Sequence, residues 1–79
     1  MYFVSNIDEL VEKGKKLLED TKFEEALACF EQALLLDQNN ADLWNHKGIA
    51  LRSIGRYDEA LECFNRSLKI DPRDSTASW

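Results

Sequence analysis

An internal duplication with a period of 34 residues is the feature that most constrains the fold of this chain. When residues 7–40 are aligned with residues 41–74, eleven of the 34 pairs are identical, several times the number that chance would supply. Some identical pairs are small or aromatic residues: Gly14 and Gly48, Ala26 and Ala60, Phe30 and Phe64. A period of this length indicates a stacked-repeat architecture, in which each unit buries its apolar face against its neighbours.

The composition is that of one small folded domain covering residues 1–79. Hydrophobic residues make up 44% of the chain and charged residues 32%, which argues against disorder. The net charge of −5 argues against nucleic acid and anionic membranes as partners, because both bind basic surfaces. Residues 7–40 carry nine acids and four bases, whereas residues 41–74 carry six of each, so a basic partner would prefer the first repeat. No apolar run approaches the roughly 18 residues that a membrane span needs.

We expect Cys29 and Cys63 to be free, buried thiols. They occupy the same position in the two repeats, so a helix spacing of about 10 Å would separate them. That distance is beyond the reach of a disulfide. Free thiols indicate a reducing compartment, and the expected location is the cytoplasm.

The spacing of apolar residues predicts four helices joined by short loops. The first follows Asn6, which with Glu9 fits a capping box, and it ends near residues 20–21. The second begins at Phe23, and its apolar stripe continues to Leu36.

The third helix follows Asn40, a good N-terminal cap, and ends at Gly55, because glycine readily adopts the left-handed conformation that closes helices. The fourth begins at Tyr57 and cannot continue past Pro72. No stretch alternates with a period of two for long enough to predict a strand. The sequence therefore predicts an all-α fold of two antiparallel helical hairpins.

Gly14 and Gly48 lie in the middle of predicted helices, where glycine costs about 0.5–1 kcal/mol relative to alanine. We expect each glycine to face the alanine that begins the following helix, Ala26 or Ala60, so that two backbones approach closely. The phenylalanine four residues further along would fill the wider part of the space between the helices.

These residues resemble the tetratricopeptide repeat (TPR) family, whose unit is a 34-residue helix–turn–helix. The second repeat carries six residues at the family's spacing: Trp44, Gly48, Tyr57, Ala60, Phe64 and Pro72. The first repeat is looser, with Leu10, Phe23 and Gln38 in place of the tryptophan, tyrosine and proline. Both repeats depart from the usual opening, with Lys13 or Lys47 before the glycine and Leu17 or Leu51 after it.

The resemblance covers residues 7–74 and implies a short right-handed stack of antiparallel helix pairs. It implies a concave groove lined by the first helix of each pair, and binding of other proteins as the activity. The family's clamp for the C-terminal carboxylates of chaperones would need Lys and Asn where this chain has Val11 and Lys15, and Asn where it has His46. We therefore do not expect chaperone-tail binding.

The sequence offers no catalytic or metal-binding constellation. His46 lacks an orienting acid and a nucleophile at a catalytic spacing, and one histidine with two cysteines a repeat apart makes no zinc site. No enzyme activity and no cofactor are expected, and Trp44 is expected in the core rather than as a ligand platform. Four acids are expected to form a solvated face, with docking of a basic peptide as the alternative: Glu9, Glu12, Glu19 and Glu24.

The candidate groove residues are those on the first-helix face opposite the glycine–alanine contact. The main candidates are Val11, Glu12 and Lys15 in the first repeat, and Asn45, His46, Ile49 and Arg52 in the second; Asp8, Glu19 and Ser53 lie on the same faces. An extended or helical peptide or protein segment of unknown identity could lie along them.

Residues 75–79 resemble the opening of a third repeat or form a tail, which leaves three interpretations open. The chain is a fragment of a longer array, or its fourth helix is buried by a second copy, or Trp79 and the Tyr2-Phe3 lead-in patch the ends of a monomer. We favour a homo-oligomer, because an uncovered apolar helix face invites a partner. Two function classes follow: an adaptor or scaffold that binds a segment in its groove, and a self-assembly module.

Overall fold

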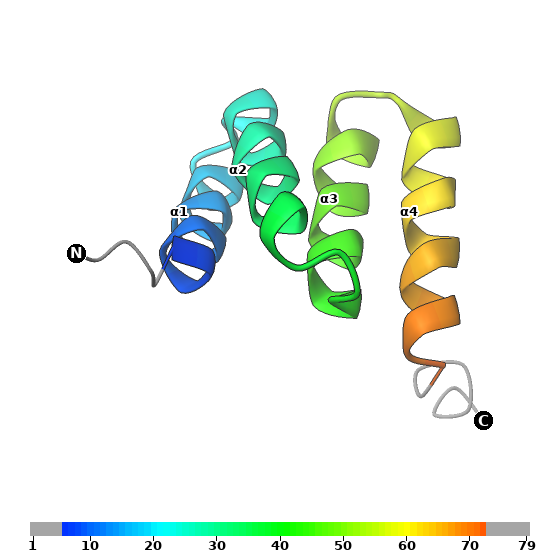
Figure 1. Ribbon diagram of the computed structural model, residues 1–79. Coiled ribbons are helices and arrows are strands. Elements are labelled where there is room, and N and C mark those ends of the chain that lie inside the picture. The colour runs from blue at the N-terminus through cyan, green and yellow to red at the C-terminus, as the bar shows by residue number, and fades with distance from the viewer. Residues whose placement is uncertain (1–5, 73–79) are drawn as a thin grey trace.

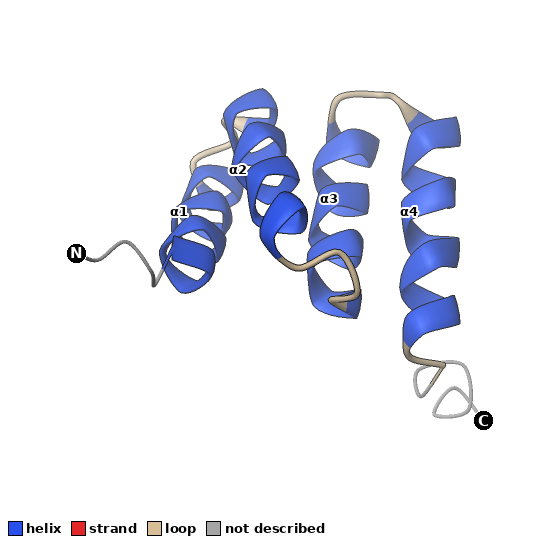
Figure 2. Cartoon of the chain, viewed as in Figure 1, coloured by secondary structure: helices blue, strands red, loops and turns tan. Residues whose placement is uncertain are grey.

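The computed structural model describes residues 6–72, and this part of the chain forms four α-helices and no strand (Figure 1). The helices are α1 (Asn6–Glu19), α2 (Phe23–Leu36), α3 (Ala41–Ser53) and α4 (Tyr57–Ile70). Figure 2 shows that short loops join them. The predicted all-α class and the predicted helices are confirmed. The expectations about the Tyr2-Phe3 lead-in and about residues 75–79 lie outside the described residues.

The helices pack in chain order. α1 packs against α2, α2 against α3, and α3 against α4, while α1 and α3 approach each other only slightly. α2 and α4 do not approach each other, because α3 lies between them (Figure 1). The result is a row of two antiparallel hairpins in which α2 and α3 join one repeat to the next.

Within residues 6–72, the core consists of two clusters that meet at the repeat boundary. The first contains Ala26, Phe30, Ala33, Leu34 and Leu43. The second contains Leu27, Ala50, Leu51, Ala60 and Cys63. Leu18 and Trp44 pack against both. Cys29 and Cys63 are free and buried, as expected.

Asn40 caps α3 as predicted, because its side-chain oxygen accepts a hydrogen bond of 3.3 Å from the backbone N–H of Leu43. The C-terminal ends of α1 and α3 are closed in the same way, by a residue with a positive φ and a backbone hydrogen bond across the turn. At α3, Gly55 has a φ of 87°, and the N–H of Arg56 donates to the carbonyl of Leu51 at 2.9 Å. At α1 the corresponding residue is Thr21, which adopts a φ of 61° although it is not glycine.

Thr21 is therefore a point of backbone strain that the sequence did not predict. The left-handed conformation costs an L-residue about 1–2 kcal/mol, and a β-branched side chain tolerates it poorly. The strain persists because the neighbouring bonds hold the turn: the N–H of Lys22 donates to the carbonyl of Leu17 at 2.8 Å. These are the bonds of a Schellman motif, which normally carries glycine at this position.

We expect Thr21→Gly to raise the free energy of unfolding by about 0.5–1 kcal/mol, because relief of strain outweighs the added flexibility of the unfolded chain. The matched variant is Gly55→Thr, which introduces the same strain at the equivalent position, where a Cβ would meet no atom within 4 Å. It should lower stability by a similar amount. Urea unfolding followed by circular dichroism measures both changes. A Thr21→Gly variant less stable than wild type would contradict the conclusion that the backbone is strained at Thr21.

The two mid-helix glycines make room for aromatic rings. A Cβ placed on Gly14 would lie 2.6 Å from the ring of Phe30, and one on Gly48 would lie 2.5 Å from the ring of Phe64. The phenylalanine rings thus fill the space between the helices, as expected, and each ring extends into the gap that the missing Cβ leaves. The close approach of each glycine to the following alanine stays a prediction.

Gly48→Ala should therefore destabilise the chain by about 1–3 kcal/mol, because overpacking outweighs the roughly 1 kcal/mol by which alanine favours a helix. Thermal and urea unfolding measure the change. The double variant Gly48→Ala/Phe64→Leu serves as the control, because removing the ring should restore part of the lost stability. A Gly48→Ala variant as stable as wild type would show that the ring does not fill this gap.

Candidate functional site

We name the seven predicted groove residues the α1/α3 row: Val11, Glu12, Lys15, Asn45, His46, Ile49 and Arg52. On α3, the adjacent residues Asn45 and His46 precede Ile49 by four and three residues, and Arg52 follows Ile49 by three, which places them on one side of the helix. Val11, His46 and Ile49 are half-buried, and the other four are exposed. The structure thus gives each half of the row both apolar and charged groups, although α1 and α3 approach each other only slightly.

His46 in this row is held in place by two contacts. Its Nδ1 lies 2.7 Å from the carbonyl oxygen of Asp42, and because a carbonyl can only accept, Nδ1 carries the donated proton. Its ring centroid lies 5.2 Å from that of Phe30, the ring that also fills the gap at Gly14. The contact with Phe30 gives the ring a packing role, and no hydrogen bond joins His46 to a carboxylate or a nucleophile of residues 6–72.

The described cavities lie on a different side of the molecule and contain none of the seven residues of the α1/α3 row. Two cavities of about 670 and 650 Å³ lie over α3, in the gap between α2 and α4. Their shared lining is Gln38, Asn39, Trp44, Lys47 and Arg66. A third cavity of about 450 Å³ lies between α1 and α2. It shares Gln32 and Leu35 with the second cavity, so the three lie next to one another, and we name them together the α2/α4 groove.

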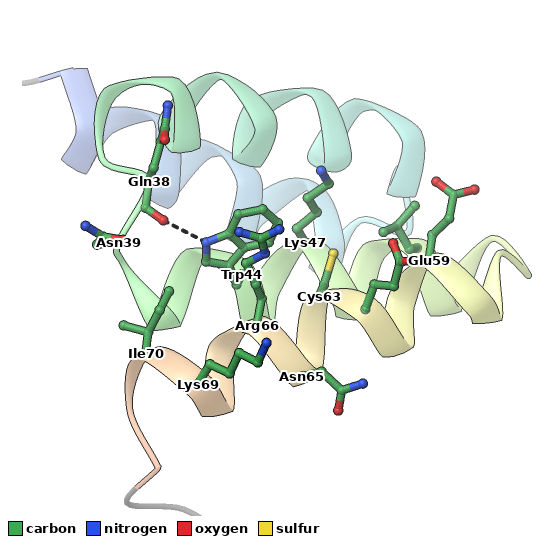
Figure 3. Close-up of a pocket in the computed structure, with 12 residues that line it drawn as sticks. Gln38, Asn39, Trp44, Lys47, Glu59, Cys63, Asn65, Arg66, Lys69 and Ile70 are labelled. Carbon is green, nitrogen blue, oxygen red and sulfur yellow. Dashed lines mark hydrogen bonds between the residues drawn. The ribbon is translucent and has the colours of Figure 1, made fainter.

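Trp44 is the central side chain of this groove (Figure 3). Its indole N–H donates a hydrogen bond of 2.8 Å to the carbonyl oxygen of Gln38, which fixes the ring against the α2–α3 loop. Lys47 Nζ lies 5.3 Å from the ring centroid, and the guanidinium carbon of Arg66 lies 5.0 Å from it. Each such cation–π contact contributes about 0.5–1 kcal/mol at an exposed site. Trp44 therefore positions two cations at the cavity and is only partly the core residue that we expected.

The two ends of the groove occupy equivalent positions in the two repeats but differ in chemistry. Leu10, Gln32 and Leu35 of the first repeat correspond to Trp44, Arg66 and Lys69 of the second. Leu35 is 77% exposed, so the first end presents apolar surface to solvent. The second end is aromatic and cationic.

Some charged side chains at the second-repeat end of the groove form ion pairs, and others do not. Arg56 donates hydrogen bonds of 2.9 and 2.7 Å to the two carboxylate oxygens of Glu59, which holds the pKa of Glu59 below its ordinary value and raises that of Arg56. Lys47 forms an ion pair of 3.7 Å with Glu31. Arg66 and Lys69 form no ion pair with any carboxylate of residues 6–72.

The groove offers no reactive nucleophile or metal ligand set. Cys63 lines it, but burial raises the pKa of its thiol against the opposing effect of Lys47, so the thiol stays protonated at neutral pH. Among the described residues no three potential ligands (His, Cys, Asp or Glu) gather where they could hold a metal ion. No helix within residues 6–72 has the length and apolar character of a membrane span.

The sequence did not lead us to the α2/α4 groove, because we interpreted mainly the positions that are alike in the two repeats. The positions at which the repeats differ indicate the groove. Positions 44, 66 and 69 change from apolar or neutral residues in the first repeat to an aromatic residue and two cations in the second. Such residues on solvent-facing sides of helices point to a surface role.

Two family models match the chain. One, described as "Tetratricopeptide repeat", matches residues 41–74, and the other, described as "TPR repeat", matches residues 8–52. No curated protein matches the chain.

Proposed function

The chain belongs to the tetratricopeptide repeat family, and from that premise we propose that it binds a peptide or protein segment along the α1/α3 row, as an adaptor or scaffold without catalytic activity. TPR repeats generally mediate protein–protein interaction. The proposal assigns this role to one face of the chain and places the protein in the cytoplasm.

The observation that carries the proposal is that the row displays polar groups with no partner among residues 6–72. The side chains of Glu12, Lys15 and Asn45 are exposed and make no hydrogen bond or ion pair with the described residues. Arg52 is also exposed, and its guanidinium lies 6.0 Å from the ring of Phe64. The helices that carry these groups are already ordered, so binding costs little backbone freedom, which favours recognition of a segment laid across them.

Replacing Asn45 and Arg52 by alanine should weaken binding at the α1/α3 row about tenfold or more, because two polar contacts at a recognition surface contribute about 1.4 kcal/mol or more together. A peptide selected from a displayed random library against the full chain provides the probe. Chemical shifts of the isotope-labelled chain locate the peptide, and the titration gives its Kd. The melting temperature should fall only slightly, because neither side chain is buried and Arg52 loses only its contact with the ring of Phe64.

The matched control is Asn65→Ala/Arg66→Ala, which removes the same two residue types from α4. It should leave binding at the α1/α3 row intact. Selected peptides that shift only residues outside the row, or that bind the Asn45→Ala/Arg52→Ala variant as well as wild type, would contradict the proposed role of this face.

A second candidate function is self-assembly through α4, and a comparison of the two repeats favours it. Leu27 and Leu34 of α2 are each only 6% exposed, because α3 covers them. Their equivalents on α4, Leu61 and Leu68, are 59% and 39% exposed, since none of the other described helices packs over them. This face fits either the first helix of a further repeat or a second copy of the chain.

If a second copy covers this face, Leu61→Gln/Leu68→Gln should convert a dimer into a monomer without lowering the melting temperature of the monomer. Light scattering across a dilution series measures the mass. Leu35→Gln is the matched control, because this leucine is exposed on α2 and not on α4. A wild-type chain that stays monomeric at the highest concentration would exclude self-assembly.

A further inference from the structure

We propose that the α2/α4 groove is a second binding site, separate from the α1/α3 row, and that it takes a peptide segment in which acidic residues lie a few positions from apolar ones. The proposal does not depend on the function assigned to the row, because the two surfaces share no residue.

The cationic end of the groove selects an acidic group. Arg66 and Lys69 both line the cavity of about 670 Å³, and neither is neutralised by a carboxylate of the described chain. Arg66 is held over the indole of Trp44, so its guanidinium is positioned before a ligand arrives. A positioned guanidinium binds carboxylates through paired hydrogen bonds, and it loses less freedom than a flexible side chain would.

The carboxylates around this end do not remove its preference for anions. Glu59 is bound by Arg56 on both oxygens, and Glu31 is paired with Lys47. Glu62 also lines the cavity but forms no ion pair with a described cation. The chain has a net charge of −5, yet this cavity holds two cations without carboxylate partners. These two cations predict that the ligand is negatively charged.

The other end of the groove selects apolar side chains. Leu10, Leu35 and Leu36 line the cavity between α1 and α2, and Leu35 and Leu36 are 77% and 58% exposed. Covering exposed leucines is favourable by roughly 25 cal/mol for each Å² of apolar surface removed from water. An apolar residue of the ligand therefore gains most at this end.

The middle of the groove connects the two ends and sets the spacing of the ligand. The cavity of about 650 Å³ shares Leu35 with the apolar end and Arg66 with the cationic end. α3 separates α2, which carries Leu35, from α4, which carries Arg66, by on the order of one helix diameter, about 10–12 Å. About four residues of extended chain span that distance. Exposed side-chain amides of Gln32, Gln38 and Asn39 border this stretch and can bind the ligand backbone.

The test uses a synthetic peptide with a leucine pair, a Gly/Ser spacer of about four residues and a run of aspartates. It is titrated into the full, isotope-labelled chain. The indole N–H signal of Trp44 and the backbone signals around Leu35 and Arg66 should shift together and saturate. The same peptide with asparagine at every aspartate should bind about tenfold more weakly, and added salt should weaken only the aspartate form.

Two variants show which groove residues contribute to the affinity, and a third serves as the control. Arg66→Gln/Lys69→Gln should lower the affinity about tenfold. Leu35→Ser should also lower the affinity, because it removes apolar contact surface while leaving every charged group in place. Lys22→Gln removes an exposed cation from the α1–α2 loop and should have no effect. All replaced side chains are exposed, so the variants should keep a cooperative unfolding transition, with a slightly lower melting temperature only where the contact between Arg66 and Trp44 is lost.

The proposal is overturned if the peptide does not saturate, if its shifts map to the α1/α3 row, or if the aspartate and asparagine peptides bind equally. Asn45→Ala/Arg52→Ala should leave binding of this peptide unchanged. The same variant tests the proposed function of the α1/α3 row with the peptide selected from the library. Either proposal can therefore be contradicted while the other stands.

Discussion

The contact between a glycine on the first helix and a phenylalanine ring on the second fixes the geometry of both hairpins. The rings of Phe30 and Phe64 occupy the space that a Cβ on Gly14 or Gly48 would need. Phe30 is completely buried and also contacts His46 of the next repeat, so the same ring joins two hairpins. Phe64 is only half-buried, because no described helix follows α4. The two surfaces that we assign to binding both depend on this arrangement.

The duplication lets one repeat serve as the control for the other. Where the two agree, as at the glycines and phenylalanines, the residues build the fold. Where they differ, the change has a local consequence: Thr21 in place of glycine introduces strain, and Trp44 in place of Leu10 creates a ring that holds two cations. The differences therefore carry more information about function than the identities.

Helix positions and ends could be predicted from the sequence because local rules determine them. Asn40 caps a helix, Gly55 closes one, and Pro72 prevents continuation. The α2/α4 groove could not be predicted in the same way, because it depends on α3 holding α2 and α4 apart. The spacing of residues placed Phe30 and Phe64 beside the glycines, but it does not say how closely each ring approaches the glycine backbone. The role of the α1/α3 row stays a prediction.

The most direct measurement of the glycine–phenylalanine contact is the nuclear Overhauser effect between the ring protons of Phe64 and the α-protons of Gly48, together with the equivalent pair Phe30 and Gly14. The structure predicts strong cross-peaks for both pairs, and glycine α-protons shifted upfield by the ring currents. Glycine α-protons at ordinary chemical shifts, without cross-peaks to either ring, would contradict the packing from which both binding faces are assigned.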